Sequence, residues 1–410
     1  MLARVCKSST IALCWAFLAS LCFGAQNDDT RLKSLYDNHQ WFELRDAVKK
    51  GGASAFYQGA VACAFNEVQE CERKFRSLFD SATRSEQAIE AHRTLASAYL
   101  THGEYKKALL QIDALLGISP SDSDALGGRP VIAALAKSPD QQLLGRRTEL
   151  QLEDAGLPFA INGVHAAYWF DTGADLSVLT ESEAKRFGLR VQPASLQVGD
   201  LNGTQVNTKI AVADEMHIGS IRIRHVAFLV LPDTQPPFGE GEPGSRGLIG
   251  MPVLLALRTF VWSADKSFEI GIKSARASAP HADLCFDGNH PAVQVVYEKQ
   301  PLAFALDTGA TNTDLYPPFG AAFPELVRAA KKTDTYKMEG VGGAKNMEAA
   351  TLESLKLSIG GFPVTLKSVG VLLKPTTNAS RFFAGNLGID LLQQAHKTTF
   401  DFKTMMLSLE

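Results

Sequence analysis

The chain has 410 residues, of which 45% are hydrophobic and 21% charged, with a formal net charge of −3. Its composition is that of a globular protein, and its length predicts two or three domains. The small net charge gives no long-range attraction to nucleic acid or to an anionic membrane, and no basic stripe with interleaved aromatic residues is present. We therefore expect no nucleic-acid partner.

Residues 1–25 have the form of a secretory signal peptide. Arg4 and Lys7 precede an apolar run over residues 11–23, and two small residues then lead into a polar segment. The run is too short for a transmembrane helix, so we expect cleavage near residue 25 and a periplasmic or secreted protein. The bulky Leu21 before Cys22 disfavours a lipoprotein, and an uncleaved membrane anchor is also less favoured. No later segment is predicted to span a membrane.

Residues 26–118 are predicted to be entirely helical. Small residues at Ala96 and Ala108 flank a turn at Gly103, and the pattern ends before Pro120. This spacing resembles a tetratricopeptide repeat, and two weaker repeats lie upstream. Such repeats imply a surface for a protein partner, and a generic helical bundle is the alternative. Residues 119–145 are predicted to be a linker with a short helix near residues 131–137.

Three cysteines follow the predicted signal peptide. Cys63 and Cys71 are eight residues apart around a predicted helix–turn–helix, and export would permit a disulfide between them. Two buried thiols are the equally favoured alternative. A later group of residues has metal-binding side chains, but we interpret it as a linker strand and expect no metal. This group comprises His281, Asp283, Cys285, Asp287 and His290.

From residue 146 onward, short alternating strands and turns predict an all-β region that contains a duplication. The segment YWFDTGA at residues 168–174 recurs as FALDTGA at residues 304–310. A later element, GLIG at residues 247–250, recurs as GNLG at residues 385–388. We therefore divide the region into a first lobe, residues 146–276, and a second lobe, residues 277–410.

Two Asp-Thr-Gly motifs in a duplicated unit are far more specific than one such tripeptide. On these motifs, residues 146–410 resemble the aspartic peptidases. The alanine after each motif (Ala174 and Ala310), the glycine-rich segment 340–343 and the small lobes resemble the retroviral-type branch. The fusion of both lobes in one chain resembles the pepsin-like enzymes. The implied fold is an N-terminal helical-repeat region followed by a bilobal all-β aspartic-peptidase fold.

By this resemblance, Asp171 and Asp307 are the catalytic pair and no cofactor is needed. Two carboxyl groups about 3 Å apart share one proton, so one activates water while the other donates a hydrogen bond. The resemblance also implies residues that support the site, namely Thr172, Gly173, Thr308, Gly309, Gly250 and Gly388. It further implies flap residues that cover the site, namely Asp200, Gly203, Gly340 and Gly342.

Three features depart from the family pattern or compete with it. Met251-Pro252 follows the first glycine element and Asn386 lies within the second, but neither is expected to contact the aspartate pair directly. The segment 239–244 formally matches a dinucleotide-binding fingerprint. Its acidic residues and Pro243 oppose phosphate binding, so we interpret it as a surface loop.

The function expected from the sequence is therefore that of an aspartic endopeptidase acting on a peptide or protein substrate. The alternative is a non-catalytic peptide-binding protein, or a repeat-based adaptor, that retains the peptidase fold. The presence of both aspartates favours the enzyme, because a degenerate relative would usually have lost one of them.

Overall fold

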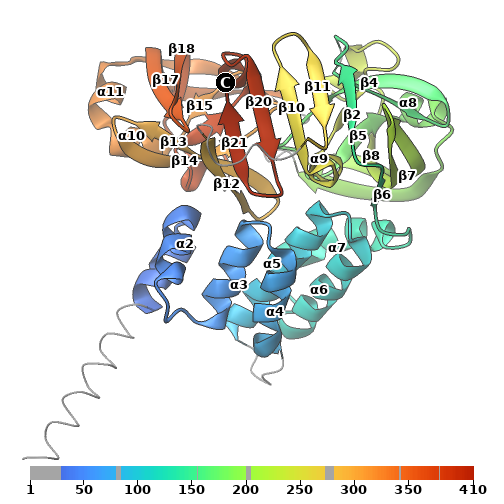
Figure 1. Cartoon of the computed structure of the whole chain (residues 1–410), viewed down its shortest axis with the longest axis horizontal. Helices are drawn as coiled ribbons and strands as arrows, with labels where there is room; N and C mark the ends of the chain where they lie inside the picture. The colour runs from blue at the N-terminus through green and yellow to red at the C-terminus, as the bar shows by residue number, and fades with distance from the viewer. Residues whose placement is uncertain are drawn as a thin grey trace, which may run out of the picture.

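The computed structural model describes residues 29–79, 85–154, 156–199, 205–272, 281–340, 343–377 and 379–410. The predicted signal peptide and the predicted flap residues Asp200, Gly203 and Gly342 lie outside these ranges. The chain forms an N-terminal array of helices followed by an all-β region, which confirms the predicted fold class. Two β lobes lie side by side above the helices (Figure 1).

The helical array begins with residues 29–37, which are helical, and continues through α2 to α7. Helices α5 and α6 pair across a turn at Gly103, whose φ of +69° suits glycine. This is the expected helix–turn–helix, and its assignment to the tetratricopeptide repeats stays a prediction. The bounds are α2 (Trp41–Lys49), α3 (Ala55–Ala64), α4 (Val68–Phe79), α5 (Glu86–Thr101), α6 (Tyr105–Ile118) and α7 (Ser123–Leu135).

Helix α7 (13 residues) occupies about half of the predicted linker, so the helical array extends to residue 135. The helix starts at Asp122, whose side chain accepts a hydrogen bond from the Ala125 amide at 2.9 Å. Pro130 lies inside it, which disfavours a helix on local grounds. The N-cap and the packing of Leu135 against lobe 1 outweigh that local cost.

A disulfide joins Cys63 of α3 to Cys71 of α4, with the two Cα atoms 5.2 Å apart. Of the two alternatives that the sequence leaves open, the structure has the disulfide. It joins the consecutive helices α3 and α4 near the turn between them. Cys285, the other cysteine among the described residues, is buried and unpaired.

Lobe 1 is built on a mixed sheet in which β4, the strand that leads to Asp171, is central. β4 pairs in parallel with β9, and β5 pairs in parallel with β8. The sheet order is β1-β8-β5-β9-β4-β3-β7-β6. The strands are β1 (Gln142–Leu144), β3 (Leu157–Ile161), β4 (Val164–Phe170), β5 (Ser177–Thr180), β6 (Val191–Gly199), β7 (Gln205–Ile218), β8 (Ile221–Leu231) and β9 (Gly247–Ile249). The helices are α8 (Glu181–Arg186), η1 (Phe238–Glu240) and α9 (Met251–Leu257).

Lobe 2 repeats this arrangement, as the duplication predicts. β14 leads to Asp307 and pairs in parallel with β19, while β15 pairs in parallel with β18. The strands are β12 (His281–Asp287), β13 (His290–Tyr297), β14 (Gln300–Leu306), β15 (Asp314–Leu315), β16 (Lys331–Gly340), β17 (Gly343–Ile359), β18 (Phe362–Leu372) and β19 (Gly385–Leu387). The helices are α10 (Pro317–Ala322), α11 (Pro324–Ala329), η2 (Ala379–Arg381) and α12 (Ile389–Leu392).

A shared sheet joins the lobes through strands in the order β12-β21-β20-β10-β11-β2. At its centre β10 pairs with β20, with Val261 opposite Thr399, and each lobe contributes matching strands on its own side. Stacked aromatic rings bridge the junction, since Phe260 and Phe400 have ring centroids 4.7 Å apart. The remaining bounds are β2 (Thr148–Gln151), β10 (Thr259–Ser263), β11 (Ser267–Ile270), β20 (Lys397–Asp401) and β21 (Met406–Leu409).

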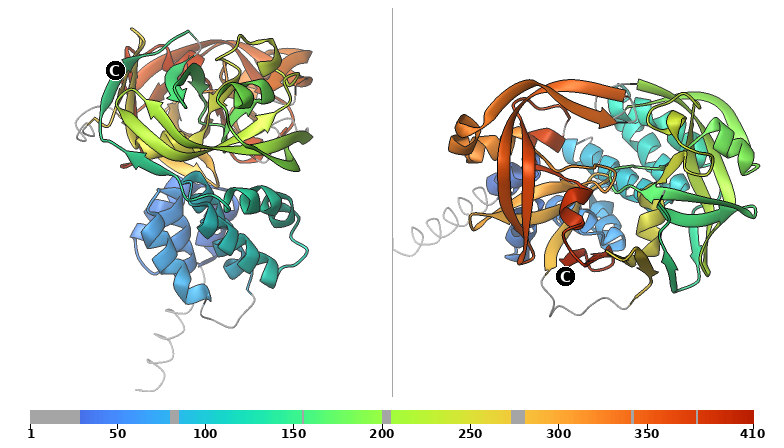
Figure 2. Two further views of the ribbon diagram at one scale, coloured as in Figure 1. Left: turned by 90° about the vertical axis from the view of Figure 1, so that its right-hand side faces the viewer. Right: turned by 90° about the horizontal axis from the view of Figure 1, so that it is seen from above.

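The helical array packs against both lobes, and it lies below the all-β region in the side views (Figure 1; Figure 2, left). α2 and α3 contact β12 of lobe 2, while α7 contacts β6 and β7 of lobe 1. Arg45 pairs with Asp283 at 2.7 Å, and the Trp41 indole donates to Asp287 at 3.0 Å. Asp283 and Asp287, two members of the group with metal-binding side chains, therefore contact the helical array. Within the described ranges no group of three or more His, Cys, Asp or Glu side chains is placed to hold a metal.

None of the helices described is both long enough and apolar enough to cross a membrane.

Candidate active site

Asp171 and Asp307 lie in two loops that face each other across the lobe boundary. Each loop is fixed to the adjacent glycine element, because the Asp171 amide donates to Ile249 at 2.8 Å and the Asp307 amide donates to Leu387 at 3.0 Å. A Cβ atom on Gly309 would lie 2.5 Å from Cγ of Asp171, and one on Gly173 would lie 2.8 Å from Cγ of Asp307. Each loop thus touches the carboxyl group of the other, and glycine is needed at both contacts.

Thr172 and Thr308 lock the two loops together through reciprocal hydrogen bonds. Each backbone amide donates to the hydroxyl oxygen of the other threonine at 3.0 Å. Each hydroxyl in turn donates at 2.7 Å to a carbonyl of the opposite lobe, Leu306 for Thr172 and Phe170 for Thr308. Both side chains are fully buried. This satisfied network holds the two loops in one relative position.

The two carboxyl groups receive different sets of hydrogen bonds. Oδ1 of Asp171 accepts from the Gly173 amide at 2.7 Å. Oδ1 of Asp307 accepts from the Gly309 and Ala310 amides at 2.9 and 3.1 Å. Oδ2 of Asp307 also accepts from the side-chain amide of Asn386 at 3.1 Å.

Asn386 therefore contacts the aspartate pair, and the expectation that it would not was wrong. Its strand, β19, pairs with β14 so that Asn386 lies opposite Ala305, two residues before Asp307. The duplication could have indicated this contact between Asn386 and Asp307, because the glycine element lies beside the motif strand in both lobes. A polar side chain in that element is therefore placed next to the carboxyl group.

The pKa of Asp171 is raised well above its ordinary value. Burial of the carboxyl group is the main cause, and the nearby charge of Asp307 adds to it. Hydrogen bonds from the Gly173 and Gly309 amides oppose the shift without cancelling it. A proton is therefore held on this pair of carboxyl groups at a pH where an isolated aspartate would be ionised.

Gly250 and Gly388 pack against the loops that follow the two aspartates. A Cβ on Gly250 would lie 2.4 Å from the carbonyl carbon of Leu176, and one on Gly388 would lie 2.6 Å from that of Asn312. The Met251 amide donates to the Ala174 carbonyl at 2.9 Å, so the residue after the first glycine element helps to hold the Asp171 loop.

Trp169 is a second residue near the site that the sequence analysis did not single out. Its indole nitrogen donates to the Thr308 carbonyl at 2.6 Å, so a side chain of lobe 1 contacts the motif loop of lobe 2. It also packs edge-on against Trp262 of the shared sheet, with centroids 5.7 Å apart. Ala305 occupies the equivalent position in FALDTGA, and this difference between the copies was the available signal.

Two long hairpins, β6–β7 and β16–β17, stand where flaps were predicted. Gly199 pairs with Gln205 in lobe 1, and Gly340 pairs with Gly343 in lobe 2, so the intervening tips lie beyond the described residues. Tyr336 of β16 donates a hydrogen bond to Asp314 of β15, which ties the second hairpin to its lobe. Burial raises the pKa of Asp314 to about 6, although the Tyr336 hydrogen bond opposes the shift.

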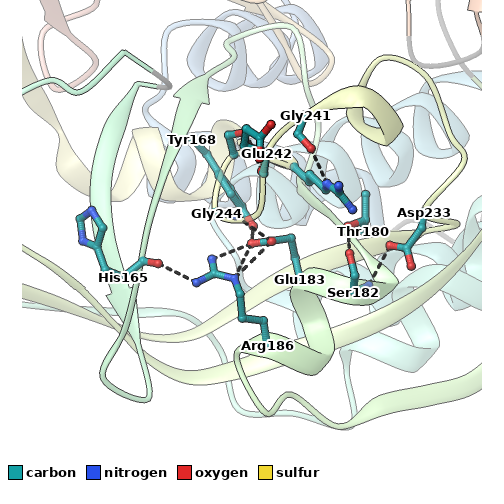
Figure 3. Close-up of polar contacts among 12 residues, drawn as sticks. His165, Tyr168, Thr180, Ser182, Glu183, Arg186, Asp233, Gly241, Glu242 and Gly244 are labelled. Atoms are coloured by element: carbon teal, nitrogen blue, oxygen red, sulfur yellow. Dashed lines mark hydrogen bonds and ion pairs between the residues drawn. The ribbon is translucent and has the colours of Figure 1, made fainter.

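The segment 239–244, which matches a dinucleotide fingerprint, serves an internal contact. The Gly244 amide donates at 2.8 Å to the buried carboxylate of Glu183 (Figure 3). The same carboxylate accepts from the Tyr168 hydroxyl at 2.8 Å and from Arg186 at 2.7 Å. The segment thereby joins helix α8 to strand β4, which leads to Asp171.

Comparison with known proteins finds one family model that is similar to part of lobe 1. Residues 157–253 match the sequence model of a family described as Aspartyl protease, and this range contains Asp171 and the first glycine element. No curated protein matches the chain. Among solved structures, the chain is similar to a retropepsin-like aspartic protease from Rickettsia conorii, at 22% identity and a TM-score of 0.24, over 32% of this chain and 87% of that one. The sequence of lobe 1 therefore supports a place in the aspartic peptidase superfamily.

Proposed function

We propose that this protein is an aspartic peptidase that hydrolyses peptide bonds at the Asp171/Asp307 pair. One observation carries the proposal: the reciprocal contacts of Thr172 and Thr308 hold one aspartate from each lobe at a single place. The family match over residues 157–253 supports the same chemistry for lobe 1. The non-catalytic alternative is less favoured, because both carboxyl groups are retained and face each other.

The chemistry follows from a pair that carries one proton. The ionised carboxylate takes a proton from a water molecule, whose oxygen attacks the peptide carbonyl carbon, while the protonated carboxyl donates to the carbonyl oxygen. The tetrahedral intermediate then collapses, the C–N bond breaks, and the amine leaves with a proton from the pair. The pair again holds one proton at the end, and the products are a carboxylic acid and an amine.

We further propose that the protein is exported from the cytoplasm. The disulfide between Cys63 and Cys71 supports this, because such bonds persist in oxidising compartments. Fractionation of cells that express the full chain tests it, with the mature protein expected in the periplasm or the medium. Full-length protein retained in the cytoplasm would contradict the proposal.

The catalytic proposal is tested by digesting a peptide library with purified wild-type protein beside Asp171→Asn. The variant should cleave at least about 10³-fold more slowly, since the asparagine can neither take nor give the shared proton. Asp154→Asn is the matched control, because Asp154 is exposed and pairs with Lys266 at the surface. An Asp171→Asn protein that cleaves as the wild type does would refute the dyad.

A further inference from the structure

The glycine elements of the two lobes differ at one position beside the aspartate pair. Leu248 in GLIG corresponds to Asn386 in GNLG. Leu248 is nearly buried and packs in an apolar cluster with Val178 and Leu231. Asn386 instead donates its side-chain amide to Oδ2 of Asp307 at 3.1 Å. The two aspartates therefore lie in corresponding loops but differ in the side chain that the glycine element places beside each of them.

The added donor acts on the charge of Asp307. An amide N–H can only donate, and a hydrogen bond from a donor favours the ionised form of a carboxyl group. With the Gly309 and Ala310 amides, Asp307 accepts three such bonds. Asp171 accepts from the Gly173 and Gly309 amides and has an apolar leucine, which offers no donor, at the position equivalent to Asn386. Tyr316 also faces Asp307; burial raises its pKa, so it stays neutral and adds no charge.

We propose that Asn386 breaks the symmetry of the pair, so that Asp307 is the carboxylate that activates water and Asp171 carries the shared proton. This assignment rests on the proposed peptidase function. Asn386 is a positioning residue here, since it acts through Asp307 and not on the substrate. The raised pKa of Asp171 is consistent with the same assignment.

The test is the pH profile of kcat/KM in Asn386→Leu, which copies the lobe 1 residue into lobe 2. Loss of the Asn386 amide donor should shift the acidic limb of the kcat/KM profile to higher pH by about one unit, because ionised Asp307 loses one charge-assisted hydrogen bond. The double variant Leu248→Asn/Asn386→Leu moves the donor to the other lobe and should restore the limb. Thermal unfolding checks that both variants are folded.

An acidic limb that stays in place in folded Asn386→Leu would overturn the assignment, as would a double variant that shifts as far as the single one. Absence of hydrolysis by wild-type protein would instead refute the peptidase proposal itself. The two failures are therefore distinguishable.

Discussion

The alanines after the two Asp-Thr-Gly motifs set an expectation for pH. A serine or threonine there can donate to the carboxylate and lower its pKa, and alanine cannot. Ala310 instead offers its backbone amide to Asp307 at 3.1 Å, whereas the Ala174 amide donates to a backbone carbonyl. Together with the raised pKa of Asp171, this predicts a bell-shaped profile that peaks at mildly acidic to near-neutral pH.

The measurement is kcat/KM against pH for the wild type and for Ala174→Ser with Ala310→Ser. The added hydroxyls favour the charged form, so the acidic limb of the double variant should move to lower pH. A wild-type optimum near about pH 2–3, or a double variant with an unmoved limb, would contradict the argument.

At the scale of single residues, the sequence allowed prediction of those site residues that are present in both copies of the duplication. Asp171, Thr172 and their counterparts appear twice, and their spacing is enough to bring them together. Asn386 and Trp169 occur once each, so the duplication marks them only as differences between the two copies. Their contacts depend on which strand lies beside β14 and on how the lobes meet, and neither follows from local periodicity.

Helix α8 depends on the buried carboxylate of Glu183. Burial alone would raise the pKa of Glu183, but hydrogen bonds from Arg186, Gly244 and Tyr168 outweigh it and hold the pKa below its ordinary value. Glu183→Gln should lower the free energy of unfolding by about 2 kcal/mol near neutral pH. Glu181→Gln on the same helix should change little, since Glu181 pairs with Lys209 at the surface.

The sign of the pH dependence follows from the lowered pKa. The stabilisation by Glu183 is fully present above the unfolded pKa of about 4.3 and is lost as pH falls through the lower folded value. Denaturant unfolding of the wild type and Glu183→Gln should therefore converge in acid. A difference between them that persists at low pH would contradict this account.

The disulfide between α3 and α4 is a second prediction at the scale of elements. Replacing Cys63 and Cys71 together by alanine should cost about 2–3 kcal/mol in the stability of the helical array, because an eight-residue loop is no longer closed in the unfolded chain. Thermal unfolding with and without reductant measures this. Reductant should lower the unfolding temperature of the wild type but not that of the double variant. If reductant destabilises the double variant equally, the effect does not come from the Cys63–Cys71 disulfide.

Element boundaries were less predictable where local preference and packing disagree. Gly127, Gly128 and Pro130 argue for a loop, yet α7 forms because its apolar face, including Leu135, packs on lobe 1. The lobe 1 surface on which α7 packs is distant in sequence, so the local pattern of residues 123–135 cannot predict this contact. The alternating strands were predictable because their period of two depends only on neighbouring residues.

For the whole molecule, the duplication predicted two lobes but not how they are joined. The shared sheet, with β10 and β20 at its centre, depends on pairings between residues far apart in the chain. The docking of the helices on β12 likewise uses Asp283 and Asp287, which the sequence presents only within a group of metal-binding side chains in a predicted linker strand. Sequence periodicity cannot assign partners to such charges.

The central claim is that one aspartate from each lobe of a single chain forms one hydrolytic site. Asp171→Asn and Asp307→Asn, assayed separately and as an equimolar mixture on a peptide that the wild type cleaves, test this most directly. Both variants and their mixture should be inactive, because every chain then lacks one member of its own pair. Wild-type activity in either variant would contradict the paired site, and activity recovered on mixing would contradict its formation within one chain.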